Sequence, residues 1–386
     1  MIIDTIYTIC YKIRPIRILK IALKIFSAIR MILNDEITYY PKKVQRLEEY
    51  FAKLTSKGCA LSFSSGTSAL EAALYSIKPR ISSRNTILVP AMNFHSDLDA
   101  ILNLGFKIKF IDVDEHGILP SIANIVRAVD EQVGCVLICH LFGYHINTDY
   151  LSVFLKERDI LLIEDCSHAH CEIKEGINIV KNSDISFFSL QGAKGVAAGE
   201  GGIAVTDDRE LFIRMSAYSH FGRHDHEFSQ YGLIDLIGTG VGHKHRMHPI
   251  GAALALEDLR FLSVSNNIIE KNAQRIMKIC NKHNMTYSFY GSTSSSRFGG
   301  FPLLMQHPEA ADRLEMILIG NGIRFKRYPY VQHNKITRYK CYVDLPNTKY
   351  VLDRMILLDR RYLEYLPKFK LNIIEACLKE YNQLPI

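Results

Sequence analysis

The chain has 386 residues, of which 48% are apolar and 23% charged, with a formal net charge of +7. This length suits a large catalytic domain joined to a smaller one, and this composition excludes an intrinsically disordered chain. The absence of tryptophan and of any basic motif interleaved with stacking aromatic residues argues against nucleic-acid binding. Nine scattered cysteines, without an evident cleavable signal peptide, indicate a reducing compartment, and we expect a cytoplasmic protein.

The positive charge is concentrated in an N-terminal segment, residues 1–37, which is also strongly apolar. Before residue 35 a single acidic residue, Asp4, opposes the basic residues Lys12, Arg14, Arg17, Lys20, Lys24 and Arg30. These basic residues interrupt the apolar stretch too often for a membrane span of about 20 residues. Arg17, Lys20 and Lys24 share one stripe of a predicted helix, which leaves a broad apolar face. We favour a helix packed on its own protein or on a dimer partner, and peripheral contact with a membrane surface is the open alternative.

From residue 58 to about 206, short β-rich runs alternate with helical patterns, which is typical of a mostly parallel sheet with crossover helices. The predicted strands are Thr86–Val89, Lys107–Ile111, Cys135–Cys139, Ile160–Ile163, Ile185–Leu190 and Ile203–Val205. A helical pattern that begins near Pro249 leads to a smaller α/β unit with the runs Gly299–Leu304 and Ile323–Tyr328. We therefore predict an α/β protein with a large domain of residues 38–258 and a small domain of residues 259–386. Ligand-binding groups should lie at the C-terminal ends of the strands.

The first polar cluster that can carry chemistry is residues 64–71, Ser-Ser-Gly-Thr-Ser-Ala-Leu-Glu, at the start of an apolar-periodic helix. Ser68 and Glu71 have the spacing of a capping box. Free amide groups at such a terminus, with the hydroxyls of Thr67 and Ser68 beside them and Gly66 permitting close approach, form a site for a phosphate. Most clusters of this kind are plain helix caps, so this one indicates a phosphate site only together with other signals.

Two further segments supply such signals. The apolar run from Ile160 to Ile163 continues directly into Glu164 and Asp165, so a carboxylate stands at the end of a predicted strand. There it can pair with the pyridine nitrogen of pyridoxal 5'-phosphate (PLP), although an isolated aspartate at a strand end more often caps a turn. Lys194 is the single amine in a glycine-rich loop between two predicted strands. A lysine near a phosphate and a buried ring can form an imine with an aldehyde, whereas a lone loop lysine is usually a solvated charge.

Together the three segments resemble the DegT/StrS family of PLP-dependent sugar aminotransferases, of fold type I, clearly over residues 45–260 and loosely beyond. Residues 65–70, Ser-Gly-Thr-Ser-Ala-Leu, are similar to the family's Ser-Gly-Thr-Ala-Ala-Leu. This likeness implies that Thr67 and Ser68 bind the cofactor phosphate beside Gly66. Residues 90–94, Pro-Ala-Met-Asn-Phe, resemble the segment whose aromatic residue stacks on the PLP ring, which implies that role for Phe94.

The resemblance also assigns the residues of the later motifs. Glu164 and Asp165, with His168 three residues further on, match a family pattern in which the last side chain contacts the phenolic oxygen of PLP. Ser189 is implied to be another phosphate ligand, and Lys194 is implied to hold the cofactor as a Schiff base. The implied reaction is a two-stage transamination, in which glutamate or glutamine supplies an amino group to a keto-sugar. We expect the keto-sugar to be nucleotide-linked.

One segment departs from the family. Residues 242–247, Gly-His-Lys-His-Arg-Met, resemble the family's Gly-x-Asn-x-Arg-Met, a loop that reaches into the active site of the neighbouring subunit of a homodimer. Lys244 stands in place of the usual asparagine, so a full positive charge would meet the phosphate across the dimer. Substrate selection is expected to depend on loop side chains, for which the candidates are His95, His220, Arg327, Tyr328, Tyr330 and His333.

Four alternative functions have to be weighed, of which two stay open. The glycine clusters do not sit between an early strand and its helix, which excludes a dinucleotide-binding fold of the usual kind. Cysteine, histidine and acidic residues near Asp165 have no recognised zinc spacing, and we predict no metal site. The remaining rivals are a sugar dehydratase of the same family and a non-catalytic regulatory protein. Because the dehydratases of the family carry histidine at the imine position, Lys194 favours transamination.

Overall fold

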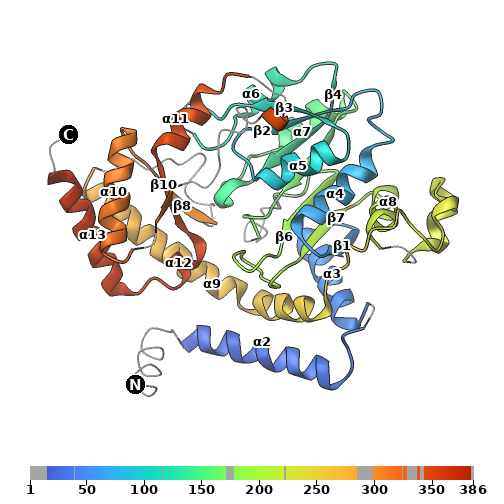
Figure 1. Ribbon diagram of the computed structural model, residues 1–386, viewed down its shortest axis with the longest axis horizontal. Helices are drawn as coiled ribbons and strands as arrows, with labels where there is room; N and C mark the ends of the chain where they lie inside the picture. Colours follow the sequence, from blue (N-terminus) through green and yellow to red (C-terminus); the bar gives the residue numbers. More distant parts are fainter. Residues whose placement is uncertain are drawn as a thin grey trace.

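The computed structural model describes residues 15–38, 40–115, 117–170, 178–220, 223–284, 299–323, 325–327, 337–339 and 343–383. Its larger lobe is built on a seven-stranded sheet (Figure 1). In spatial order the strands are β1 (Cys59–Phe63), β7 (Gly202–Thr206), β6 (Ile185–Ser189), β5 (Leu161–Asp165), β4 (Val133–Cys139), β2 (Thr86–Pro90) and β3 (Lys107–Ile111). The five strands from β6 to β3 are parallel, whereas β7 pairs antiparallel with both β1 and β6. The six predicted strands and the α/β class are confirmed, and β1 is an additional strand.

Helices cover both faces of this sheet, which explains why its strands are apolar without alternation. One face packs against α4 (Gly66–Ile77), α5 (His95–Asn103) and α8 (Arg209–Ser219). The other packs against α3 (Lys42–Thr55) and α9 (Pro249–Lys282) near β6 and β7, and against α6 (Ile122–Ala128) and α7 (Asp149–Lys156) near β4 and β5. Adjacent residues of one strand serve opposite faces, as Phe187 and Phe188 of β6 do. The sheet is therefore a rigid platform with fully buried strands.

The long helix α9 joins the larger lobe to the smaller one (Figure 1). The smaller lobe contains an antiparallel sheet in the order β8 (Gly300–Leu304), β10 (Met355–Asp359), β9 (Lys326–Arg327). Its helices are α10 (Pro308–Gly320), α11 (Pro346–Arg354), α12 (Arg360–Glu364) and α13 (Lys368–Gln383). The domain boundary expected between residues 258 and 259 lies inside α9 and stays a prediction.

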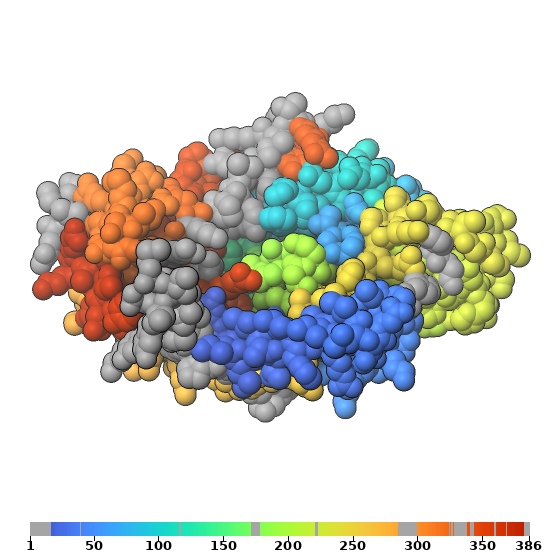
Figure 2. All heavy atoms as spheres, turned by 60° about the horizontal axis from the view of Figure 1, so that its bottom comes forward, coloured from blue at the N-terminus to red at the C-terminus, as the bar shows by residue number. Residues whose placement is uncertain are grey.

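Helix α2 (Pro15–Leu33) lies along α9 with its basic side inward. Lys20 Nζ is 3.1 Å from Glu364 Oε1, and Lys24 Nζ is 2.8 Å from Asp258 Oδ2. The opposite side is apolar and exposed, with Phe26 65% accessible, and α2 forms a ridge on the face shown in Figure 2. The helix thus packs on its own protein, as favoured, but through its basic stripe. Among the described helices, none combines the length and apolar character that a membrane span requires.

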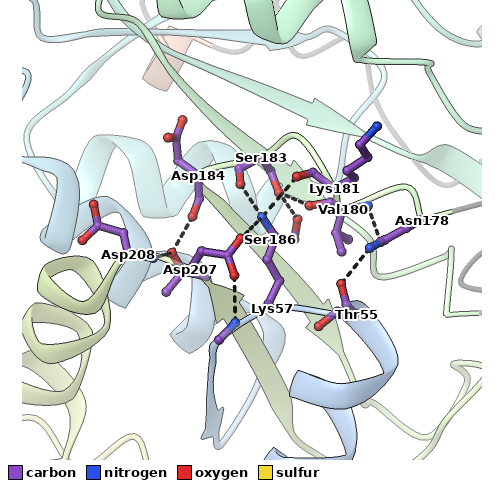
Figure 3. Close-up of polar contacts among 12 residues, drawn as sticks. Thr55, Lys57, Asn178, Val180, Lys181, Ser183, Asp184, Ser186, Asp207 and Asp208 are labelled. Atoms are coloured by element: carbon purple, nitrogen blue, oxygen red, sulfur yellow. Dashed lines mark hydrogen bonds and ion pairs between the residues drawn. The ribbon is translucent and has the colours of Figure 1, made fainter.

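A buried lysine fastens the start of β1 to the neighbouring strands (Figure 3). The Lys57 ammonium donates to the carbonyl oxygen of Ser183 at 2.9 Å and to that of Lys181 at 3.4 Å, and it lies 3.0 Å from Asp207 Oδ2. Asp207 Oδ1 in turn accepts the backbone N–H of Gly58 at 2.8 Å. This polar cluster lies where β6 begins and β7 ends, at the edge of the sheet opposite to the C-terminal ends of the parallel strands.

Candidate active site

A cavity of about 420 Å³ opens at the C-terminal edge of the parallel strands. Its walls come from the ends of β4, β5 and β6, from the segment between β2 and α5, from the first residues of α4 and from the loop after β6. The predicted residues that line it are Gly66, Thr67, Phe94, Asp165, His168, Ser189 and Lys194. The sheet therefore brings predicted residues that are up to 128 positions apart in the sequence, from Gly66 to Lys194, to one edge.

The first turn of α4 forms one end of the cavity. Ser65 is the cap, because its Oγ accepts the backbone N–H of Ser68 at 3.0 Å. The capping-box interpretation of Ser68 and Glu71 was therefore wrong, and the helix begins earlier, at Gly66. A Cβ at Gly66 would lie 2.8 Å from Ser189 Cβ, so only glycine lets β6 approach the helix this closely. The unpaired amides of the first turn, with the hydroxyls of Thr67 and Ser189 beside the same cavity, suit a phosphate.

Asp165 is the last residue of β5 and is buried, with 4% of its surface accessible. Its Oδ1 accepts the backbone N–H of Ser167 at 2.8 Å, and its Oδ2 accepts the thiol of Cys139 at 3.4 Å. Burial raises the pKa of the Cys139 thiol well above its ordinary value, which keeps that group a neutral donor. Asp165 is thus a carboxylate held in one orientation from both oxygens, as a partner for a protonated ring nitrogen would need to be.

Lys194 belongs to a loop that folds back on itself. The backbone N–H of Gly192 donates to the carbonyl oxygen of Gly199 at 2.7 Å, and Gly199 has a φ of +90°, a conformation that favours glycine. Among the described residues, none forms an ion pair or hydrogen bond with the Lys194 ammonium. Burial lowers the pKa of Lys194, and the attraction of Asp165 only partly opposes that shift. A lowered pKa increases the fraction of the uncharged amine, which is the form that attacks an aldehyde.

Two ring-bearing residues lie at the same cavity. Phe94 caps α5 and exposes 44% of its surface, so its ring is available to a ligand. His168 Nδ1 accepts the backbone N–H of Phe142 at 3.3 Å, which leaves its Nε2 to carry the ring proton. Burial and the charge of Lys194 lower the pKa of His168 well below its ordinary value. His168 is therefore a neutral hydrogen-bond donor through Nε2, as contact with a phenolic oxygen requires.

The structure also reveals cavity residues that sequence reasoning missed. Asp97, in the first turn of α5, and Cys139, at the end of β4, line the cavity beside Asp165. Ser167 Oγ accepts the backbone N–H of Ser189 at 3.0 Å and connects β5 to β6. The sequence carried no signal that singled out Asp97, because an acidic residue in the first turn of a helix is common.

Other predicted residues lie outside this cavity in the described parts of the chain. Ser68 is buried and pairs with the hydroxyls of Ser64 and Ser65. Lys244 is exposed, and its backbone bridges to His220, which is buried. His95 is an exposed neighbour of Phe94, and the Arg327 guanidinium donates to the backbone oxygen of Asp353 at 2.8 Å. Tyr328, Tyr330 and His333 lie outside the described residues.

The metal-ligating residue types near Asp165 form one cluster in the described part of the chain, His140, Glu164 and Cys166. All three are buried, and His140 Nε2 lies 3.6 Å from Glu164 Oε2. Burial raises the pKa of the Cys166 thiol, so this thiol is held in its protonated form. Because Glu164 precedes Asp165 on β5, the two side chains point to opposite faces of the sheet. The cluster is therefore separate from the cavity.

The cavity residues fit PLP in both charge and arrangement. A phosphate-binding helix terminus, a buried carboxylate and an amine of lowered pKa are the three groups that this cofactor requires, and all three border one space. Phe94 and His168 supply an aromatic face and a neutral donor between them. Gly66, Thr67 and Ser189 would hold the phosphate, Asp165 the ring nitrogen and Lys194 the aldehyde carbon.

Several curated proteins are similar to this chain in sequence. The chain is 28% identical over 244 residues to GDP-perosamine synthase of Escherichia coli O157:H7, an alignment that covers 62% of this chain and 65% of the relative. It is 24% identical to GDP-4-keto-6-deoxy-D-mannose 3-dehydratase of Escherichia coli O55:H7, over 80% of this chain and 83% of the relative. The alignment with protein MosB of Rhizobium meliloti, at 29% identity, covers 56% of this chain and 43% of that relative. The chain thus matches less than two thirds of the length of the first and third of these relatives.

Solved structures confirm the fold. An aminotransferase from Psychrobacter cryohalolentis superposes with a TM-score of 0.79 at 18% identity, over 92% of this chain and 95% of that one. The E. coli GDP-4-keto-6-deoxy-D-mannose-3-dehydratase with bound hydrated PLP superposes with a TM-score of 0.78 at 21% identity, over 92% and 96% of the two chains. At these identities the likeness concerns the fold alone. Residues 20–362 match the sequence pattern of one family across nearly the whole chain, and the protein belongs to the DegT/DnrJ/EryC1/StrS aminotransferase family.

Proposed function

We propose that the protein is a PLP-dependent aminotransferase that moves an amino group from glutamate or glutamine to a keto-sugar. The observation that carries this proposal is a lysine of lowered pKa, Lys194, which shares one cavity with Asp165 and the first turn of α4. Membership of an aminotransferase family and the likeness to GDP-perosamine synthase support it. A nucleotide-linked keto-sugar is the substrate class that we infer.

When bound, PLP supplies an aldehyde that condenses with amines and a ring that delocalises the electrons of a broken bond. Lys194 would hold that aldehyde between turnovers. With PLP and the amino donor bound, the Lys194 amine, whose pKa is lowered by burial, would take the proton from the α-carbon of the donor, and in the second half-reaction it would deliver a proton to the sugar carbon that gains the amine. The donor leaves as a keto acid and the keto-sugar leaves as an amino sugar.

The other residues of the cavity hold the reacting groups in place. Asp165, fixed from both oxygens, keeps the ring nitrogen protonated. Phe94 would supply an aromatic face for the ring, and His168 would donate from Nε2 to the phenolic oxygen. Gly66, Thr67 and Ser189 bind the phosphate, with Ser68 supporting them through its bonds to neighbouring serines.

A sugar dehydratase is the second candidate, because one relative and one fold neighbour carry that name. Dehydratases of the family are implied to have histidine at the imine position, where this chain has Lys194. A lysine there anchors the cofactor and moves a proton, which transamination requires. This difference is the reason to prefer amine transfer.

We also propose that the protein is a homodimer whose active sites are shared between the two subunits. Its proposed location is the cytoplasm. Lys244 is exposed and outside the cavity of its own subunit, which suits a residue that contacts the phosphate of a partner. The described cysteines are free thiols, which suits a reducing compartment. We do not propose a membrane contact for residues 1–37, which remains the alternative that we do not favour.

The test uses purified protein supplied with PLP, glutamate or glutamine, and a panel of nucleotide-linked keto-sugars. Amine transfer produces equal amounts of keto acid and of an amino sugar, which mass spectrometry detects. A sugar that loses a hydroxyl without gaining nitrogen would establish the dehydratase instead. A protein that shows no visible PLP absorbance after reconstitution would support the non-catalytic alternative.

A further inference from the structure

A second buried carboxylate, Asp97, lies beside Asp165 in the cavity and has no part in the mechanism described above. Asp97 is in the first turn of α5 and is 3% accessible. Its side chain lies within hydrogen-bonding reach of the Asp165 carboxylate. Two carboxylates in contact inside a protein cannot both be ionised without strong repulsion, so the pair shares a proton.

The hydrogen bonds show which member holds that proton. Asp165 receives the backbone N–H of Ser167 and the thiol of Cys139, one on each oxygen, and both bonds stabilise its negative charge. Asp97 Oδ1 receives only a hydroxyl, from Ser96 at 3.4 Å. Asp97 Oδ2 is buried and receives no donor from the described residues. The proton therefore belongs on Asp97, where it supplies the missing hydrogen bond.

The pKa shifts of Asp97 and of the titratable groups around the pair support this assignment of the proton. Burial raises the pKa of Asp97 well above its ordinary value, and the charge of Asp165 raises it further. Lys194 opposes that shift, but its own pKa is lowered by burial. Cys139 and His168 both favour their neutral forms, because burial raises the pKa of the thiol and lowers that of the imidazole.

We propose that Asp97 is a positioning residue, a neutral carboxylic acid that donates a hydrogen bond to Asp165 and aims that carboxylate at the cofactor ring nitrogen. This inference rests on the proposed function, because it needs a ring nitrogen for Asp165 to meet. With Asp97, the Asp165 carboxylate is fixed by three donors from three elements, namely β4, the turn after β5 and α5. The cavity then contains one ionised carboxylate and not two.

Infrared difference spectroscopy tests the protonation directly. The spectrum of the wild type minus that of Asp97→Asn, at pH 7, should contain the C=O band of a protonated carboxylic acid. Asp99→Asn is the matched control, because Asp99 lies on the same helix and forms an ion pair with Arg338. That control should remove only carboxylate bands. A carboxylate band in the Asp97 difference spectrum would overturn the proposal. The experiment works with and without PLP, so its result is independent of whether the protein is an aminotransferase.

Kinetics test the positioning. Asp97→Ala removes the donor, and kcat should fall about 10- to 100-fold while the visible absorbance of bound PLP and the KM for the amino donor change little. Asp97→Asn keeps a donor of the same size and should recover most of the lost kcat. Equal losses in the two variants, or no loss in Asp97→Ala, would overturn the positioning role. Absent PLP absorbance in the wild type would contradict the proposed function and leave the infrared result standing.

Discussion

Two lysines are withdrawn from solvent at opposite edges of the same sheet, and their surroundings differ in kind. Lys57 is 7% accessible, and its ammonium meets two backbone carbonyls and the carboxylate of Asp207. Lys194 borders a cavity, and within the described chain its ammonium meets no bonded partner. Burial with bonded partners makes the first lysine a structural cation, whereas burial without them lowers the pKa of the second and makes it a reactive amine.

Replacing Lys194 should have the largest effect on turnover of all the substitutions proposed here. Lys194→Ala should reduce turnover at least about 10³-fold, because the amine that moves the proton is lost. The melting temperature should stay near that of the wild type, since the loop lysine contributes little to the core. Keto-acid release measures the activity and circular dichroism measures the fold. Transamination at the wild-type rate in this variant would refute the assignment.

Replacing Asp165 should have the second largest effect on turnover. Asp165→Asn keeps the shape of the side chain but removes the charge that holds the ring nitrogen protonated, and kcat should fall about 10²-fold or more. PLP should still bind, because the phosphate site and Lys194 are intact. Absorbance at saturation measures cofactor binding, and turnover unchanged by the substitution would show that another group protonates the ring.

Lys57 should show the opposite pattern to Lys194. Lys57→Met leaves the buried carbonyl oxygen of Ser183 and the part-buried one of Lys181 without their donor, which should cost about 1–3 kcal/mol of unfolding free energy. Turnover should change little, because the polar cluster lies at the far edge of the sheet. The matched control is Lys53→Met, at an exposed position of α3. Chemical denaturation compares the variants, and equal stability of Lys57→Met and Lys53→Met would refute the structural role.

The pH dependence of stability should separate Asp97 from the two lysines. Because the pKa of Asp97 is raised in the folded protein, its stabilising contribution is complete below the ordinary pKa of aspartate, near 3.8, and is lost as the pH rises toward the folded value. Relative to Asp97→Asn, the cofactor-free wild type should lose about 1.4 kcal/mol of unfolding free energy per pH unit in that range. Urea denaturation from pH 5 to pH 8 measures the slope, and parallel curves would contradict the raised pKa.

Lys194 should give a pH trend of the opposite sign and smaller size. Its lowered pKa means that the folded protein disfavours the ammonium, so this penalty is present at neutral pH and disappears as the pH rises toward 10. Cofactor-free Lys194→Met should therefore be more stable than the wild type at pH 7, by about 1 kcal/mol, with the gap closing at alkaline pH. A constant gap from pH 7 to pH 10 would argue against the shift.

The sequence predicted the sheet and the residues at strand ends well, for a physical reason. Strands buried on both faces are short apolar runs, and polar residues that follow such runs in a parallel sheet must meet at one edge. Asp165 and Lys194 were found in this way, whereas the role of Ser189 came from the family resemblance. Strand β1 was not predicted because Ala60 and Ser62 have weak strand propensity. Strand β10 was not predicted because its apolar run follows a helical pattern directly.

The parts of the site that depend on tertiary contacts could not be predicted. Asp97 is an acid in the first turn of a helix, which is a common place for a carboxylate, and only the folded structure places it against Asp165. The orientation of α2 also followed tertiary contacts, because the ion pairs of Lys20 and Lys24 with Asp258 and Glu364 connect distant segments. Periodicity identified the apolar face of that helix but not the direction in which it points.

Reduction of the PLP-loaded protein with borohydride, followed by peptide mass mapping, tests the central assignment most directly. The reduction makes the bond between cofactor and lysine permanent, so the modified residue can be identified. The cofactor mass should appear on the peptide that contains Lys194 and be absent from the peptide that contains Lys57. Modification of a different lysine at full occupancy, with Lys194 unmodified, would contradict the account.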